Sequence, residues 1–124
     1  MSHPNTAGIT AAVLTGDFTL TTATLTSGAL LADLYRLIGC DTVDLVPLDE
    51  GLDMWLDDEG LYNNETPNPA ATMVAHLYGF TRQPYYGAVV FTGGVDEDGN
   101  ALPLSHQTMR RLAELTALAQ RMPA

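Results

Sequence analysis

The stretch VDLVPLDEGLDMWLD, residues 43–57, decides the fold class of this 124-residue chain. Residues 43–48 and 52–57 are compatible with strands, and Asp49-Glu50-Gly51 between them is typical of a turn. Apolar side chains alternate with others in the second segment: Leu52, Met54 and Leu56 against Asp53, Trp55 and Asp57. This alternation predicts a strand with one face in the core and the other face in water, where Trp55 would be partly exposed.

Further strands are predicted on both sides of this hairpin. Residues 9–14 and 18–25 indicate two strands separated by a turn. The nearly continuous apolar run 86–92 indicates a central strand. Residues 101–104 follow an Asp-Gly turn signal and indicate a short edge strand, because Pro103 cannot donate a ladder hydrogen bond.

Three helices are recognised by the residues at their ends. The N-terminal caps are Thr26 or Ser27, Asn68 and Ser105, and glycines end the first two helices at Gly39 and Gly79. Together the elements predict an α+β fold in a single domain over residues 1–124, with a loose tail over 1–7. The sheet would be mixed or mainly antiparallel, with about six strands packed by three helices.

The chain is strongly acidic, with 15 Asp and Glu residues against five bases, all arginine, and a formal net charge of −10. Nine of the acids lie in residues 41–65, and no base occurs between Arg36 and Arg82. Such a chain lacks the basic surface that nucleic-acid phosphates or anionic membranes attract, so we expect it to bind neither directly. A single cysteine, Cys40, and the lack of a signal-peptide or membrane-length apolar run favour a cytoplasmic location.

The acidic segment 41–65 has three interpretations. It can be a solvated face that keeps the protein soluble, a docking surface for a basic partner, or a divalent-cation site. Mimicry of DNA is a special case of docking. Asp57 and Glu59 would imitate neighbouring phosphates if the strand ran far enough to place both on one face.

No sequence motif assigns a reaction. Residues 96–100 begin like a calcium loop, but Ala101 and Gln107 stand where that loop needs Gly and Glu. Zinc, phosphate-loop and nucleophile patterns are missing, so the sequence names no catalytic residue, metal or cofactor.

Aromatic residues suggest an alternative function. Seven of the nine aromatic residues lie between Trp55 and Phe91, interleaved with amides and one arginine. Aromatic walls with a few polar groups suit a pocket for a small, nucleotide-like ligand, with Arg82 or Arg110 facing an anion. The candidate residues of that pocket are Trp55, Tyr62, Asn63, Asn68, Arg82, Tyr85 and Tyr86.

Four blocks of sequence carry a resemblance to a known family. They are LDMWLDDEGLY at 52–62, PNPAAT at 67–72, QPYYGAVVFTGG at 83–94, and DEDG at 96–99 with LPL at 102–104. In order and spacing they resemble the domain of unknown function 3846 family, small proteins frequent in actinobacteria, their mobile elements and phages. The resemblance spans about residues 30–112 and implies a small cytoplasmic α+β domain that serves as an accessory protein. It supplies no catalytic residues. Because phages and mobile elements carry many proteins that bind and block host defences, the resemblance favours binding over catalysis.

The leading hypothesis is a non-enzymatic protein that binds a basic protein surface through its acidic face, for example to block a host defence. Its candidate contact residues are Asp53, Trp55, Asp57, Asp58 and Glu59. The alternative is the small-ligand pocket described above. A homodimer is also considered, because apolar residues of the last helix form a wide stripe: Met109, Leu112, Leu115, Leu118 and Met122.

Overall fold

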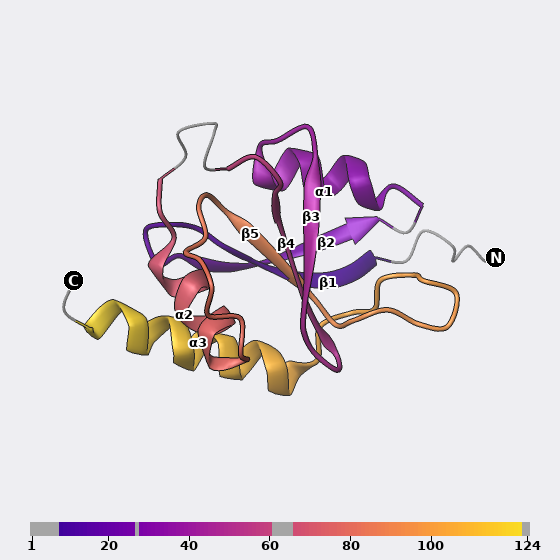
Figure 1. Ribbon diagram of the computed structural model, residues 1–124. Coiled ribbons are helices and arrows are strands. Elements are labelled where there is room, and N and C mark those ends of the chain that lie inside the picture. Colours follow the sequence, from indigo (N-terminus) through magenta and orange to yellow (C-terminus); the bar gives the residue numbers. More distant parts are fainter. Residues whose placement is uncertain (1–7, 27, 61–65, 123–124) are drawn as a thin grey trace.

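The computed structural model describes residues 8–26, 28–60 and 66–122 (Figure 1). In chain order the elements are β1 (Gly8–Leu14), β2 (Leu20–Thr26), α1 (Leu30–Ile38), β3 (Val43–Asp49), β4 (Leu52–Asp57), α2 (Pro69–Leu77), β5 (Val89–Thr92) and α3 (His106–Arg121). The strands form one sheet in the order β2-β1-β5-β4-β3, and all neighbouring strands are antiparallel. The predicted α+β class is confirmed, with five strands in place of about six.

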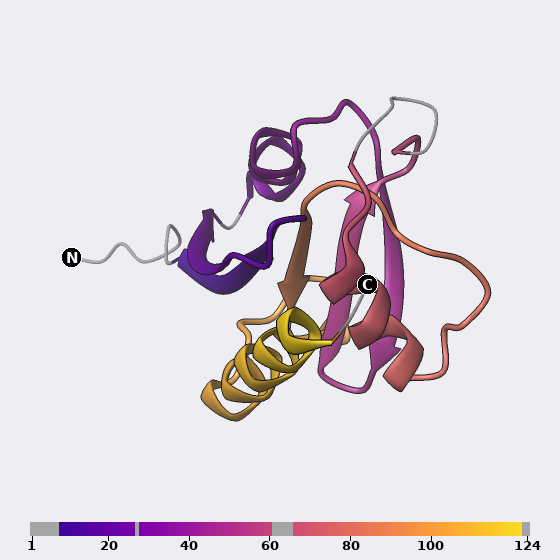
Figure 2. The ribbon, with the colours of Figure 1, turned by 90° about the vertical axis from the view of Figure 1, so that its left-hand side faces the viewer.

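Helices cover both faces of the sheet. In Figure 2, α2 and α3 lie on one side of the strands and α1 lies on the other. The larger cluster of buried residues joins α2 and α3 to alternate residues of the strands, such as Met54 and Phe91. The smaller cluster joins α1 to the opposite face, where Val90 and part of Trp55 pack. As predicted, β5 is the central strand, and all four of its residues are buried.

The expectation that β4 has one face in water is wrong. Asp53 and Asp57 are 5 % and 4 % exposed, although Trp55 is partly exposed as predicted. The side chains of residues 52–57 do alternate between the two faces of the sheet, but helices cover both of these faces. When a helix covers the second face of a sheet, the polar side chains on that face are buried as well. The alternation of apolar and polar residues in the sequence does not show whether such a helix is present.

The predicted edge strand over residues 101–104 does not form. Ala101 forms an isolated antiparallel bridge to Val95, and the Leu102 N–H donates to the Gly94 carbonyl at 2.9 Å. Beyond that bridge the segment follows the residues after β5, and the Gly93 N–H donates to the Leu102 carbonyl at 2.8 Å. Pro103 supplies no N–H, so the pairing cannot become a regular ladder.

The helix ends mostly follow the predicted signals. Asn68 caps α2 by accepting from the Ala71 N–H at 3.0 Å, and Ser105 caps α3 through the Thr108 N–H at 3.1 Å. Gly39 ends α1 in the left-handed region at φ 81°. The cap predicted at Thr26 is wrong, because α1 begins after Ala29, which makes no side-chain cap. Ser27 lies outside the described residues.

Candidate functional site

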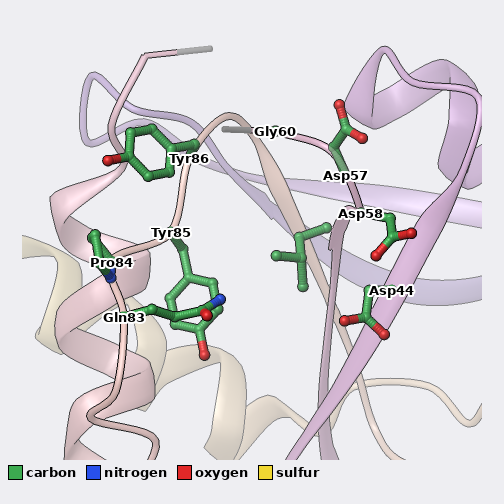
Figure 3. Close-up of a pocket in the computed structure, with 9 residues that line it drawn as sticks. Asp44, Asp57, Asp58, Gly60, Gln83, Pro84, Tyr85 and Tyr86 are labelled. Carbon is green, nitrogen blue, oxygen red and sulfur yellow. The ribbon is translucent and has the colours of Figure 1, made fainter. Parts of the chain in front are cut away.

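A pocket of about 380 Å³ opens between the β3–β4 hairpin and the segment that leads into β5 (Figure 3). We call it the acidic pocket. Its lining residues are Asp44, Leu56, Asp57, Asp58, Gly60, Gln83, Pro84, Tyr85 and Tyr86. Three of these nine residues are acids and two are tyrosines, and no base is among them.

The acidic wall comes from the pairing register of the hairpin. Asp44 of β3 is opposite Leu56 of β4, so both side chains emerge on the same face of the sheet. The chain turns immediately after β4, and the Asp58 N–H donates to the Thr42 carbonyl at 3.3 Å. That turn holds Asp58 beside Asp44, and Figure 3 shows both carboxylates on the same side of the pocket. Both residues are exposed.

Asp57 contributes to the pocket differently from these two acids. Its side chain is on the opposite face of the sheet, because it pairs with Val43, which packs in the α1 cluster. The Glu59 N–H donates to its Oδ1 at 2.8 Å. The carboxylate of Asp57 therefore shapes the turn at the end of β4, and Asp44 and Asp58 supply the charge that faces a ligand.

The aromatic wall is held by α2. The Thr72 hydroxyl accepts from the Tyr85 N–H at 2.9 Å, and the Tyr85 carbonyl accepts from the Asn68 N–H at 2.9 Å. Tyr86 forms an isolated bridge with Pro67. These contacts fix the backbone between α2 and β5, so both tyrosines stand opposite the aspartates in Figure 3.

The hydroxyl of Tyr85, on the aromatic wall, interacts electrostatically with Asp44, on the acidic wall. The Tyr85 side chain is buried, with 6 % of the residue exposed. Burial raises the pKa of the Tyr85 hydroxyl, and the negative charge of Asp44 raises it further. Within the described ranges no residue forms a hydrogen bond with this hydroxyl, so a neutral polar group is available at the pocket wall.

The five residues predicted to bind a partner do not form one surface. Asp58 and Asp57 line the pocket, and Glu59 is exposed next to them. Asp53 and Trp55 lie on the α1 face of the sheet, where the Trp55 indole N–H donates to the Thr92 hydroxyl at 2.9 Å. Burial raises the pKa of Asp53. Asp53 is therefore too buried for a direct contact with a partner, whereas Trp55 is partly exposed and stays a predicted contact.

The row of carboxylates considered as a DNA mimic is not present at the end of β4. The strand ends at Asp57, and the Gly60 N–H donates to the Asp57 carbonyl at 3.2 Å, which closes a turn. Glu59 is within that turn, so it does not continue a strand face with Asp57.

The residues predicted for a small-ligand pocket are also divided. Tyr86 lines the acidic pocket, and Tyr85 is shared with a second hollow of about 390 Å³ that includes Arg82. Asn68 is fully buried, and its amide donates to the carbonyls of Leu14 and Gly87 at 3.0 and 2.8 Å. Asn68 therefore joins α2 to the strands. Tyr62 and Asn63 lie outside the described residues, and Trp55 is on the other face of the sheet.

Sequence reasoning missed Asp44 and Gln83 as pocket residues. A signal for Asp44 was present, because a hairpin centred on Glu50 places residue 44 opposite residue 56. No comparable local signal was available for Gln83. Its position depends on how the segment after α2 packs against the hairpin.

Other candidate features have structural explanations. The Asp96 Oδ1 accepts from the N–H groups of Asp98 and Asn100, both at 2.9 Å, so residues 96–100 form a closed turn. A search of the described residues finds no group of three His, Cys, Asp or Glu residues that could hold a metal ion. None of the described helices is both long enough and apolar enough to cross a membrane.

An apolar hollow of about 490 Å³ on α2 includes Leu77 and Met122. Both side chains are more than half exposed. Of the apolar stripe on α3, Leu112 and Leu115 are buried in the core and Met122 lines this hollow. The homodimer considered from that stripe stays a prediction.

Comparisons with known proteins define the family. A family model described as "Domain of unknown function (DUF3846)" matches residues 9–117. The match runs from β1 into α3, so it covers all five strands and includes residues before position 30, where the sequence resemblance began. No curated protein and no solved structure matches the chain. This chain therefore belongs to the DUF3846 family, as its four sequence blocks indicated.

Proposed function

We propose that this protein binds a basic surface of a partner protein, with the acidic pocket at the centre of the contact. The observation that carries the proposal is the charge of the lining, whose described residues include Asp44, Asp57 and Asp58 and no base. Complementary charge accelerates the encounter of two proteins and disfavours partners of the wrong sign. Exposed Asp41 and Glu59 extend the negative surface at the same end of the hairpin.

Aromatic side chains at the pocket also favour a protein partner. Tyrosines are enriched among the residues that contribute most to binding energy at protein interfaces. Tyr85 and Tyr86 are fixed by the contacts with α2, so little conformational entropy is lost when a partner docks.

Binding is a better account of the pocket than catalysis. Its described lining contains no histidine, cysteine, serine or threonine, so none of the usual nucleophile and base pairs can be assembled there. The role we propose is that of an accessory protein of a phage or mobile element that occupies a basic site on a host protein. The single cysteine suits a reducing cytoplasm as the place of action.

The test is a charge reversal at the pocket. We expect Asp44→Lys combined with Asp58→Lys to abolish capture of a basic host protein at low salt. Both side chains are exposed, so the fold should tolerate the change. Asp57 is left intact, because its buried carboxylate shapes the turn after β4.

The matched control is Asp49→Lys combined with Glu50→Lys. This variant makes the same change in net charge at the opposite end of the hairpin, where both residues are exposed. Affinity purification followed by mass spectrometry compares the variants. A partner that both variants retain equally well would contradict the proposal.

A small anionic ligand is a second candidate, at the hollow that contains Arg82. Arg82 is exposed, and among the described residues it has no ion pair. Phe80 and Tyr85 supply aromatic surface to the same hollow. Thermal unfolding with a panel of nucleotides tests this candidate, since a ligand at 100 times its Kd adds about 2.7 kcal/mol of stability. An unchanged unfolding temperature with every nucleotide would exclude it.

A further inference from the structure

We infer that the acidic pocket takes one arginine side chain of the partner, which inserts between the Asp44–Asp58 wall and the Tyr85–Tyr86 wall. This inference rests on the proposed function and names the chemical group that is recognised. The inference depends on the arrangement of the carboxylate acceptors, on the Tyr85 hydroxyl and on the size of the pocket.

The carboxylates present acceptors without a competing base. Asp44 accepts from the Leu45 N–H through Oδ1 at 2.9 Å, which leaves its Oδ2 for a ligand. In the parts of the chain that are described, neither Asp44 nor Asp58 forms an ion pair. Two neighbouring carboxylates match a guanidinium group, whose five N–H donors form charge-assisted hydrogen bonds in a planar fork.

The Tyr85 hydroxyl provides a second, independent indication of a ligand. Tyr85 as a residue is 94 % buried, and no described residue forms a hydrogen bond with its hydroxyl. No fully buried side-chain oxygen of the described residues lacks a partner, so this hydroxyl is accessible to a ligand. Burial and the negative charge of Asp44 both raise the pKa of this hydroxyl, so it stays neutral and keeps its proton. It can accept an N–H from a guanidinium that is already held by the carboxylates.

The tyrosine wall favours arginine over lysine. Tyr86 is partly exposed at the pocket, and a flat guanidinium stacks on an aromatic face while its edge bonds to carboxylates. An ammonium group is a compact, strongly hydrated charge that cannot do both. A volume of about 380 Å³ has room for the whole side chain and for part of its backbone.

The direct test uses capped single residues as probes for the intact protein. N-acetyl-arginine amide, N-acetyl-lysine amide and N-acetyl-citrulline amide are titrated separately and followed by amide chemical shifts in NMR. Citrulline keeps the shape of arginine without its charge. We expect arginine to bind about tenfold more tightly than lysine, and citrulline to give no saturable shift. The shifts should centre on residues 44, 58, 85 and 86. Equal binding of arginine and lysine would overturn the inference.

A conservative variant tests the hydroxyl. Tyr85→Phe should weaken the arginine probe by about threefold to tenfold without lowering the unfolding temperature, because the hydroxyl has no described partner to lose. Tyr35→Phe, on α1, is the control and should leave binding unchanged. If Tyr85→Phe binds arginine as well as the parent protein, the assigned contact is wrong.

The two proposals fail in different ways. If the Asp44/Asp58 charge reversal abolishes partner capture while the probes show no preference for arginine, the docking function stands and the arginine inference is wrong. If agmatine binds at least tenfold more tightly than N-acetyl-arginine amide, the guanidinium comes from a free metabolite. That result would overturn the arginine inference and also count against the protein partner.

Discussion

At the scale of single residues, Asn68 does the most to connect the fold to the pocket. Its side chain caps α2 and donates to carbonyls at the end of β1 and before β5, and its own N–H bonds to the Tyr85 carbonyl. One fully buried amide thereby positions the aromatic wall. The Asn68 side chain both donates and accepts, so a substitution that removes either role leaves buried groups without their hydrogen bonds.

We predict that Asn68→Ala lowers the free energy of unfolding by about 2–4 kcal/mol, because two buried carbonyls and the helix cap lose their partner. Asn68→Asp should cost more, since a buried carboxylate keeps the cap but faces the carbonyls of Leu14 and Gly87. Urea unfolding measures both. Equal stability of the two variants would show that the donated hydrogen bonds contribute nothing.

The burial of Asp53 leads to a prediction about how the stability of the protein depends on pH. The dependence has the opposite sign from that of a salt-bridged acid. Burial raises the pKa of Asp53 in the folded protein, so its ionisation destabilises the fold above that pKa, and the penalty is relieved as the pH falls through it. Asp53→Asn should therefore stabilise the protein at pH 7, and the gain should shrink toward pH 4. The exposed Asp49→Asn serves as the control in the same unfolding series. A gain that does not vary with pH would contradict this account.

At the scale of elements, local signals predicted the helices and strands well, and the contacts between elements account for the differences. The caps at Asn68 and Ser105 depend on neighbours within three residues, so the sequence alone identifies them. The burial of Asp53 and Trp55 depends on α1 covering the second face of the sheet, which no local pattern reveals. The pocket is a similar case. Asp57, Asp58 and the two tyrosines were candidates separately, whereas Asp44 was not, and only the packing of residues 83–86 against the hairpin brings them together.

The close approach of two chain segments at Gly93, just after β5, leads to a prediction about stability. A Cβ on Gly93 would collide with the Pro103 carbonyl oxygen, because the segment after β5 and the returning segment approach closely. We expect Gly93→Ala to lower the free energy of unfolding by about 1–3 kcal/mol. Gly99→Ala, in the same loop, meets no atom and should cost only about 1 kcal/mol for its left-handed backbone at φ 83°. Thermal unfolding compares the two variants, and an equal cost would remove close approach as the reason for Gly93.

At the scale of the whole molecule, charge is separated between the hairpin and the last helix. The described residues that line the acidic pocket include no base, whereas α3 carries Arg110, Arg111 and Arg121. A net charge of −10 concentrated in this way favours the approach of basic proteins in one orientation.

Salt tests this orientation effect on the partner that the purification identifies. Raising the NaCl concentration from about 15 to about 150 mM should slow association with that partner by about tenfold or more and change dissociation much less. Surface plasmon resonance separates the two rates. An association rate that does not respond to salt would mean that the acidic surface only keeps the protein soluble.

The strand order also has a consequence for how the chain assembles. Strands β1 and β2 pair locally, as do β3 and β4, and among the strands of the described residues β5 alone hydrogen-bonds to both pairs. A chain emerging from the ribosome therefore cannot join its two hairpins until residues 89–92 have been synthesised. These four residues convert two separate pieces into one cooperative unit, and we expect substitutions in β5 to slow folding more than equally destabilising substitutions in the outer strand β2.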